Sequence, residues 1–515
     1  MPLDPPDRTA LRAAADRHGL GLSDPDLESF GPFVHGLLSS WDVVEQLYAE
    51  SAPVAPERAW QRPQAADNPY GAWYVTTEIT EGGQGPLAGR TVAVKDNTAV
   101  AGVPLMNGSP YLEGYVPLRD ATIVSRLLAA GATIAGKAVC EDLCFSGGSH
   151  TSRPAPVRNP WDETRSAGGS SSGSAALVAG EVVDVATGGD QGGSVRIPSA
   201  YSGTVGHKPT YGLVPYTGAF PIEQTIDHLG PITRTVADAA LVLSVIAGPD
   251  GLDPRQHRDL VPDDYVDALA RGAEGLRVGV VAEGFGHPNS EPEVDDAVRA
   301  GVDVLRGAGL VAEEVSIPWH AHGARIWDVI ATEGAMTQMV DGNGYGMNRD
   351  GLYDPEVVAY YGGRWRADGS DFSETVKLVL LAGGYAVERT HGSHYAMARN
   401  LVPRLRAAYD EALARYDVLV MPTLPLRATT LPPAGAPREE VIPRALEMVA
   451  NTCVTDVTGH PACSVPAGVA GGLPVGMMII GRHFADADVL RVAHTFEQAV
   501  GGFPAPPRAT AATGA

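Results

Sequence analysis

The sequence predicts an α/β fold in which helices cover a mixed or mostly parallel β-sheet. Short apolar runs of strand character alternate with amphipathic helical stretches along most of the 515 residues, and Gly-rich turns separate many of them. Alternation of this kind is typical of layered α/β domains. The hydrophobic content of 44% is enough to form a sizeable core.

The beginning of the chain is predicted to be helical. Residues 9–17 are rich in Ala, Arg and Leu, and residues 33–48 carry apolar side chains at helical spacing. Residues 51–72, rich in Pro, Ala and Gln, have the composition of a linker. We therefore expect a helical N-terminal region over residues 1–70, either a separate unit or a wrap over the main core.

The α/β pattern is expected to form one large domain, the catalytic domain, from residues 71–317 and 441–501. Predicted strands cover residues 91–94, 133–135, 182–186, 276–281, 310–315 and 473–480. Predicted helices cover residues 121–130, 175–179, 235–247, 293–307 and 488–500.

Residues 318–440 break this rhythm, so we expect a smaller, mainly helical inserted domain there. The segment contains a Gly/Tyr-rich piece at 342–353 and helical patterns at 373–381 and 393–416, and strand character returns at 417–422. The tail, residues 502–515, is rich in Pro, Ala and Thr and is predicted to be disordered.

Charge and composition exclude several classes of protein. The net charge is −23 and no block of basic residues occurs, which argues against nucleic-acid binding. The N-terminus lacks the basic and apolar regions of a signal peptide, and no apolar run reaches the roughly 18–20 residues that span a bilayer. We expect a cytoplasmic protein without a membrane partner.

The four cysteines do not form a recognisable disulfide framework in a chain of this length. Cys140 and Cys144 lie four residues apart, but no neighbouring His or Cys pair completes a metal-binding pattern. We therefore expect buried free thiols at these two positions and at Cys453 and Cys463, and no metal site.

Two Gly/Ser clusters, residues 168–174 and 188–194, are the most distinctive feature of the sequence. They enclose a helical piece at 175–179 and a strand-like piece at 182–186. Flexible Gly/Ser linkers do not usually enclose buried elements, whereas Gly-rich turns beside such elements indicate close approach of the backbone. The clusters therefore mark a candidate active site.

Three residues in and near these clusters could perform acyl transfer. Lys95 ends an apolar strand, and a lysine held in a dry place loses the solvation that favours its ammonium form, which leaves a competent general base. Ser170 and Ser194 lie in the two clusters. A serine needs a base to become a nucleophile, and Ser–Lys pairs are known to meet that need.

The turn around Ser194 could also stabilise the oxyanion that such a reaction forms. Successive backbone N–H groups of a Gly-rich turn can converge on one point, because no Cβ obstructs them. The segment from Gln191 through Gly192 and Gly193 to Ser194 has this composition.

Other chemistries fit the clusters less well. The phosphate-binding pattern Gly-x-x-x-x-Gly-Lys-Ser/Thr is absent, and neither cluster matches the Gly-x-Ser-x-Gly turn well. A Ser–His–Asp arrangement stays open, although a single His beside a turn is more often structural. The histidines near Gly or Pro turns are His150, His207, His228 and His460.

Taken together, these motifs resemble the amidase signature family. The motifs are Gly-Gly-Ser-Ser at 168–171, Gly-Gly-Ser-Val-Arg-Ile-Pro-Ser at 192–199, Gly-His-Lys-Pro-Thr at 206–210 and Val-Lys-Asp at 94–96. Their order and spacing also agree with the family, and the similarity extends over about residues 70–500. Ser172 stands where the family usually has Gly, and Gly189 and Gln191 stand where it has Thr.

Together with the stretch Gly-Leu-Val-Pro-Tyr-Thr-Gly-Ala-Phe-Pro-Ile-Glu at 212–223, these departures make the chain resemble the enantioselective amidases associated with nitrile hydratases in actinobacteria. The resemblance implies a mixed sheet with helices on both faces, a helical N-terminal region that forms a homodimer, and an inserted helical domain.

The resemblance also implies a role for each motif residue. Ser194 is expected to be the nucleophile, and Ser170, after a cis Gly169–Ser170 peptide bond, to relay protons to and from Lys95. The N–H groups of Gln191, Gly192, Gly193 and Ser194 are expected to form the oxyanion hole. Asp190 and Arg196 beside the nucleophile are more simply explained as an orienting ion pair or a turn cap.

The implied activity is hydrolysis of small aliphatic or arylalkyl carboxamides to acid and ammonia, without a cofactor. Apolar residues are expected to line the acyl pocket, since such sites are mostly apolar. By resemblance the candidates are Phe145, Ile226, Trp327, Leu446 and Val449. Alternatives are a hydrolase of hydrazides or anilides, a glutaminase subunit of a tRNA-dependent amidotransferase, and a binding module with a decayed site.

Overall fold

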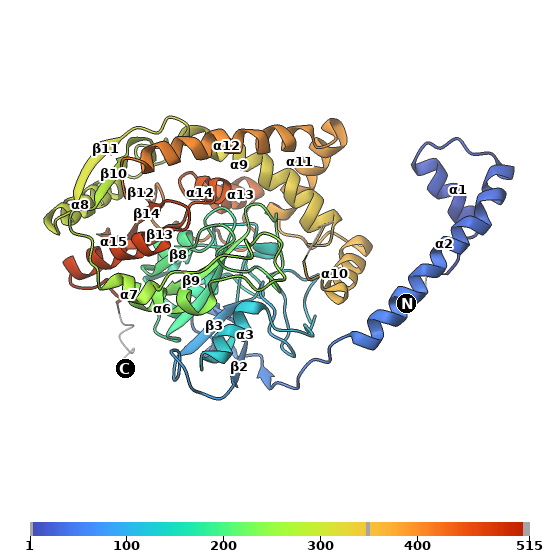
Figure 1. The fold of residues 1–515 in the computed structure, drawn as a ribbon, viewed down its shortest axis with the longest axis horizontal. Helices are drawn as coiled ribbons and strands as arrows, with labels where there is room; N and C mark the ends of the chain where they lie inside the picture. Colours follow the sequence, from blue (N-terminus) through green and yellow to red (C-terminus); the bar gives the residue numbers. More distant parts are fainter. Residues whose placement is uncertain (1–3, 347–350, 508–515) are drawn as a thin grey trace. The chain divides into compact units, whose positions relative to one another are not determined.

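The chain divides into two compact units, Met1–Pro56 and Glu57–Ala515, and the computed structural model describes residues 4–346 and 351–507 (Figure 1). The predicted N-terminal region extended to residue 70. Residues 57–70 instead belong to the second unit, where Trp60–Gln61 forms the first strand, β1, and pairs with β2.

The first unit is a pair of helices, α1 (Arg8–Arg17) and α2 (Asp24–Ser51), as the sequence predicts. Helix α2 begins with a capping box, in which the Ser23 side chain accepts from the Asp26 N–H and the Asp26 carboxylate accepts from the Ser23 N–H. This arrangement satisfies two N–H groups that a helix end otherwise leaves without partners.

The second unit is built on one mixed sheet of twelve strands. Its central pairs β7–β9, β9–β8, β8–β13, β13–β14 and β14–β12 are antiparallel, whereas β4–β3–β7 and β12–β10–β11 pair in parallel. In spatial order the strands are β1 (Trp60–Gln61), β2 (Trp73–Thr80), β4 (Thr133–Ala138), β3 (Thr91–Lys95), β7 (Val185–Asp190), β9 (His228–Thr233), β8 (Val205–Lys208), β13 (Ala462–Ala470), β14 (Leu473–Gly481), β12 (Val418–Pro422), β10 (Arg277–Val281) and β11 (Val311–Val315). A separate ribbon pairs β5 (Arg158–Asn159) with β6 (Asp162–Ser166).

Helices cover both faces of this sheet, which confirms the predicted α/β class. Successive strand residues point to opposite faces, and in β12 Val418 and Val420 pack into one apolar core while Leu419 and Met421 pack into another. The first core includes residues of α3 (Thr122–Ala129), α6 (Val236–Ile246), α7 (Tyr265–Leu269), α8 (Pro292–Gly307) and α15 (Asp486–Ala499). The second includes residues of α9 (His320–Ala335), α12 (Ser393–Leu413) and α14 (Thr452–Thr458).

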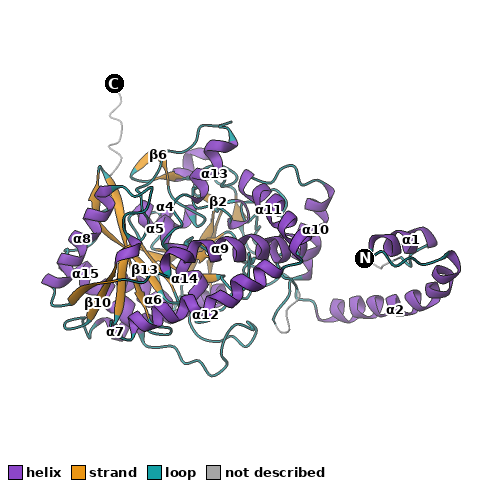
Figure 2. Cartoon of the chain, turned by 90° about the horizontal axis from the view of Figure 1, so that it is seen from above, coloured by secondary structure: helices purple, strands orange, loops and turns teal. Residues whose placement is uncertain are grey.

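The segment between β11 and β12 is helical, as predicted. It comprises α9, a π-helical turn (Met336–Asp341), α10 (Pro355–Ala367), α11 (Glu374–Thr390) and α12. Figure 1 shows α9, α11 and α12 together along one side of the unit, and Figure 2 shows the strands in orange among the helices. Strand β12, inside the range predicted for an inserted domain, instead lies between β14 and β10 in the sheet.

The remaining short helices lie in the connections between the longer elements. They are the 3-10 turns Ala65–Asp67, Pro69–Gly71, Asp142–Cys144 and Ala282–Gly284, with α4 (Ser172–Ala179), α5 (Arg196–Ser202) and α13 (Arg438–Leu446). Parts of the predicted Gly/Tyr-rich piece (347–350) and of the predicted disordered tail (508–515) lie outside the described residues. Among the helices of the described ranges, none is both long and apolar enough to cross a membrane.

Candidate active site

Lys95, the last residue of β3, is completely buried and points at a serine. Its Nζ donates to Ser170 Oγ at 2.8 Å and to the carbonyl oxygen of Gly189 at 3.1 Å. In the described part of the chain, no carboxylate forms an ion pair with Lys95. The neighbouring buried Lys137 differs, because its Nζ lies 2.8 Å from Asp96 Oδ1.

Ser170 lies between β6 and α4, and the Gly169–Ser170 peptide bond is cis, as the sequence predicts. The tight turn before it needs glycine. Gly168 has a φ of +78°, and a Cβ at this position would lie 2.6 Å from Cα of Pro198. The first Gly/Ser cluster therefore holds the Ser170 hydroxyl against Lys95.

The second Gly/Ser cluster ends in the turn from β7 to α5, residues 191–194, and each carbonyl group of this turn accepts a hydrogen bond from the protein. Trp327 Nε1 donates to Gln191 O at 2.7 Å, and Thr452 Oγ1 donates to Gly192 O at 2.6 Å. The Gly193 and Ser194 carbonyls accept from the N–H groups of Ile197 and Ser171. These bonds fix the peptide planes of the turn.

The N–H groups of the same turn have unequal surroundings. The Gly193 N–H donates to Asp190 Oδ1 at 2.6 Å. Within the described residues, the N–H groups of Gln191, Gly192 and Ser194 make no hydrogen bond to the protein. Three of the four predicted oxyanion donors, the N–H groups of Gln191, Gly192 and Ser194, are thus available to a ligand. The fourth, the Gly193 N–H, is used in a hydrogen bond within the protein.

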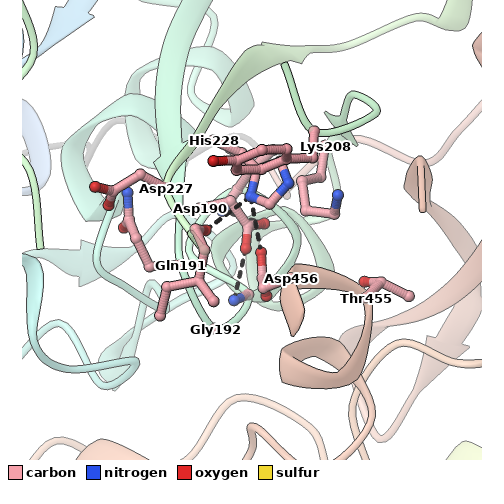
Figure 3. A network of polar contacts seen from close by, with 12 residues as sticks. Asp190, Gln191, Gly192, Lys208, Asp227, His228, Thr455 and Asp456 are labelled. Carbon is pink, nitrogen blue, oxygen red and sulfur yellow. Dashed lines mark hydrogen bonds and ion pairs between the residues drawn. The ribbon is translucent and has the colours of Figure 1, made fainter. Parts of the chain in front are cut away.

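Asp190 and Arg196 form the ion pair and turn cap that the sequence suggested. Arg196 Nη2 lies 2.9 Å from Asp190 Oδ1 and 2.9 Å from Asp456 Oδ2, and all three side chains are fully buried. Asp190 also accepts from the Val195 N–H at 3.0 Å. Figure 3 shows Asp190 and Asp456 close together, with His228 and Lys208 beside them.

The electrostatics of this cluster follow from burial and pairing. Burial alone would raise the pKa of Asp190, but the charge and hydrogen bonds of Arg196 outweigh it and hold that pKa well below its usual range. Burial lowers the pKa of Lys208 to about 8. Asp190 is therefore a carboxylate at neutral pH and a permanent acceptor for the turn.

A cavity lined mostly by apolar side chains opens beside Ser194. All five predicted pocket residues line it: Phe145, Ile226, Trp327, Leu446 and Val449. Gln191, Gly192 and Ser194 form part of its wall, and no charged side chain of the described residues lines it. Its apolar character is that of a site for an apolar group.

Sequence reasoning missed several lining residues, namely Cys144, Ser146, Ile197, Ile222 and Ala331. A signal existed for two of them. Ile222 lies in the stretch 212–223 that supported the family resemblance, and Ile197 belongs to the motif that contains Ser194. Ala331 follows Trp327 by one helical turn of α9, a relation that becomes informative only once the helix is placed.

The four histidines considered for a Ser–His–Asp arrangement have hydrogen-bond partners other than Ser170 and Ser194. His150 and His228 hydrogen-bond to backbone carbonyls through Nδ1, and His207 and His460 pair with Asp486 and Asp410. No histidine of the described residues lines the cavity or hydrogen-bonds to Ser170 or Ser194. All four cysteines are free and buried, as expected.

Comparison with known proteins agrees with this geometry. The model of the family described as Amidase matches residues 45–490. The chain is 57% identical to an enantioselective amidase of Rhodococcus rhodochrous over 512 residues, which is 98% of each chain. Among solved structures, it resembles the peptide amidase of Stenotrophomonas maltophilia (TM-score 0.67, 30% identity, 82% of this chain and 85% of that one). It also resembles one of the subunits of glutamyl-tRNA(Gln) amidotransferase from Thermotoga maritima (TM-score 0.70, 30% identity, 85% and 90%).

Proposed function

The chain belongs to the amidase family and is a hydrolase of amide bonds, and from this premise we propose that its substrates are small apolar carboxamides, which it converts to carboxylic acid and ammonia. The observation that carries the proposal is the 2.8 Å contact between Lys95 Nζ and Ser170 Oγ beside an uncharged apolar cavity that Ser194 lines.

In the proposed mechanism, Ser194 attacks the amide carbon. Lys95, acting as a neutral base, accepts a proton through the Ser170 hydroxyl as the Ser194 oxygen bonds to carbon. The same relay returns the proton to the leaving nitrogen, which departs as ammonia. Water then adds to the acyl-enzyme ester by the reverse use of the relay, and the acid is released.

The negative charge on the carbonyl oxygen is assigned to the N–H groups of Gln191, Gly192 and Ser194. Donors that are fixed before the reaction stabilise the developing charge without reorganising. The hydrogen bonds from Trp327 and Thr452 to the turn carbonyls support this assignment. Because the Gly193 N–H donates to Asp190, we propose that it positions the turn instead of binding the oxyanion.

The proposed acyl group is an alkyl or arylalkyl group. Phe145, Ile226, Trp327, Leu446 and Val449 offer apolar surface and no partner for a charge. Hydrazides and anilides would follow the same chemistry, with hydrazine or aniline as the leaving group. Glutamine fits less well, since its ammonium and carboxylate groups would lose solvation in this cavity without an ion pair.

The test is a panel of propionamide, 2-phenylpropionamide, the matching hydrazide and anilide, and glutamine, with product release measured for purified wild type and Ser194→Ala. We expect the arylalkyl and aliphatic amides to be the better substrates. Loss of the nucleophile should reduce kcat by about 10⁴-fold or more. The matched control is Ser125→Ala, at an exposed position on α3.

Three results would count against the proposal. A Ser194→Ala variant that folds and retains activity would refute the nucleophile. Glutamine as the best substrate would favour the glutaminase alternative. An intact fold with no turnover and no labelling of Ser194 by a fluorophosphonate would favour a decayed site.

We further propose that the N-terminal unit forms a homodimer. Large apolar side chains are exposed along α2, among them Phe30, Phe33, Leu37, Trp41, Val44 and Leu47. A stripe of this kind usually marks a protein–protein contact. Sedimentation of the full chain should give a dimer, and Leu37→Glu with Val44→Glu should give an active monomer; a monomeric wild type would refute the interface.

A further inference from the structure

A cluster of metal-ligand side chains lies in a part of the molecule that the proposed reaction does not use. Asp410 comes from α12, His460 from the loop between α14 and β13, and His483 from the turn after β14. One possible ligand atom of each residue lies within 4.8 Å of the others. We propose that these three residues bind a divalent transition metal ion, with Zn²⁺ as the representative ion.

The distances are close to those that a zinc ion requires. His460 Nε2 lies 3.1 Å and His483 Nδ1 lies 4.0 Å from Asp410 Oδ1. Zinc bonds to nitrogen and oxygen ligands of about 2.0–2.2 Å place tetrahedral ligand atoms roughly 3.3 Å apart. The separation of His483 Nδ1 from Asp410 Oδ1 exceeds this spacing, so the proposed ion would draw the two side chains closer together.

The hydrogen bond of the His483 ring favours the tautomer that a metal ligand requires, and the surroundings of the His460 ring permit it. His483 Nε2 lies 3.0 Å from the carbonyl oxygen of Thr458, which can only accept, so Nε2 carries the proton and Nδ1 presents its lone pair. His460 Nε2 donates to Asp410 Oδ1 at 3.1 Å, a hydrogen bond that an ion would replace. Thr458 Oγ1, 2.9 Å from His460 Nδ1, can accept the Nδ1 proton of the tautomer that frees Nε2. Outer hydrogen bonds of this type orient imidazole ligands in metal sites.

The charges of the cluster also suit a cation. Asp410 contributes a carboxylate oxygen, and the two imidazoles contribute nitrogen atoms. Arg406, whose Nε donates to Thr458 O at 2.8 Å, is a neighbouring cation that would repel a metal ion at this site.

The exposure of the ligands shows how an ion could enter. The His460 side chain is buried, but 27% of the His483 side chain and 52% of the Asp410 side chain are exposed. The open side leaves room for water as a further ligand. Two imidazoles and one carboxylate are a ligand set that suits zinc and its neighbours better than calcium or magnesium.

A metal ion here would join three elements that are far apart in sequence. It would connect α12 to the end of α14 and to the β14–α15 turn, and so hold the helical segment against the sheet. Helix α14 also reaches the catalytic turn from its other end, where Thr452 Oγ1 donates to Gly192 O. We therefore assign the site a stabilising role, since an ion that binds only the folded state raises its stability.

The test is a calorimetric titration of the chelator-treated full chain with Zn²⁺. We expect saturable binding of one equivalent at this site and a rise in Tm. His483→Ala and Asp410→Asn should each weaken binding at least about tenfold, the scale seen for disturbed metal sites, and should abolish the Tm rise. These partly exposed ligands are chosen because replacing the buried His460 could prevent folding.

The matched control is His394→Ala, which removes an exposed histidine of α12 and should leave binding unchanged. Co²⁺ provides a spectroscopic readout: ligand-field bands without thiolate charge transfer are expected, since no cysteine belongs to the site. Undiminished affinity in both ligand variants, absence of saturable binding, or a thiolate signature would each overturn the proposal.

Discussion

The two walls of the cavity are constructed in opposite ways. The polar wall is the turn from Gln191 to Ser194, which the Lys95–Ser170 pair adjoins, and it comes from strand ends and Gly/Ser turns between residues 95 and 194. The apolar wall consists of Phe145, Ile226, Trp327, Leu446 and Val449, which separate segments of the chain contribute. The first depends on backbone geometry and the second on side-chain packing.

This difference has a chemical consequence. Hydrogen bonds and glycine conformations determine the polar wall, so a displacement of a few tenths of an ångström changes the reaction itself. Side-chain volume determines the apolar wall, so a substitution there changes which acyl group fits. Trp327 belongs to both, because its ring lines the cavity and its Nε1 donates to Gln191 O.

Among the variants that test this comparison, the largest effect is expected of Lys95→Met, which removes the proposed base but keeps an apolar stem of similar length. We expect kcat on propionamide to fall by about 10²–10⁴-fold, the usual contribution of a positioned base. Steady-state kinetics measure kcat, and a thermal scan checks that the variant is folded. The control is Lys377→Met, at a partly exposed lysine of α11. A Lys95→Met enzyme with wild-type kcat would show that Lys95 is not the base.

The second prediction concerns Gly192→Ala, which tests whether the polar wall depends on backbone position. A Cβ at Gly192 would lie 2.6 Å from Cζ2 of Trp327, so the turn or the indole ring must move. We expect kcat to fall by about 10²–10³-fold, the typical result of losing one oxyanion donor.

The control for this change is Gly363→Ala in α10, where an added Cβ has open space around it. That variant should keep full activity and gain up to about 1 kcal/mol in stability from helix propensity. Equal kinetics of the Gly192→Ala enzyme and wild type would show that the polar wall tolerates displacement.

The third prediction concerns Val449→Ala, which tests whether the apolar wall selects the acyl group. Removing two methyl groups enlarges the cavity, so kcat/KM should fall for propionamide and rise for 2-phenylpropionamide. Their ratio should change by about 10–200-fold, the range associated with a methylene group or two. Leu381→Ala, at an exposed position of α11, is the control; an unchanged ratio would place the acyl group elsewhere.

The smallest expected effect concerns Asp227, the buried neighbour of Ile226 in the apolar wall. Its Oδ1 accepts from the Ile222 N–H at 3.2 Å, and among the described residues its Oδ2 has no hydrogen-bond partner. Burial raises its pKa to about 8 from an ordinary value of 3.8. The folded state therefore retains a proton that the unfolded chain releases, and its stability decreases as the pH rises from about 4 to about 8.

Asp227→Asn keeps the acceptor for Ile222 but does not titrate. Its Tm should exceed that of wild type at pH 8, and the gain should shrink as the pH falls towards 4. The kcat at pH 7 should stay within about twofold of wild type, because the residue lies behind the wall and not in it. A constant Tm difference across this pH range would contradict the raised pKa.

Local patterns in the sequence determined most of the elements and the polar wall. Helices such as α3, α6 and α8 follow from their apolar spacing, and Lys95, Ser170 and Ser194 were recognisable because Gly/Ser turns beside apolar strands indicate close approach of the backbone. Strands β8, β9 and β13 escaped prediction because Gly, Pro and His interrupt their apolar residues, and only burial in the middle of the sheet stabilises them as strands.

Only the tertiary structure decided the order of the twelve strands, the engagement of the Gly193 N–H by Asp190, and the meeting of Asp410, His460 and His483. The physical reason is the same in each case. A helix, a strand or a Gly-rich turn depends on neighbours in the chain, whereas a cavity wall or an ion-binding cluster depends on contacts between segments that are far apart in sequence, and packing of the whole core selects those contacts.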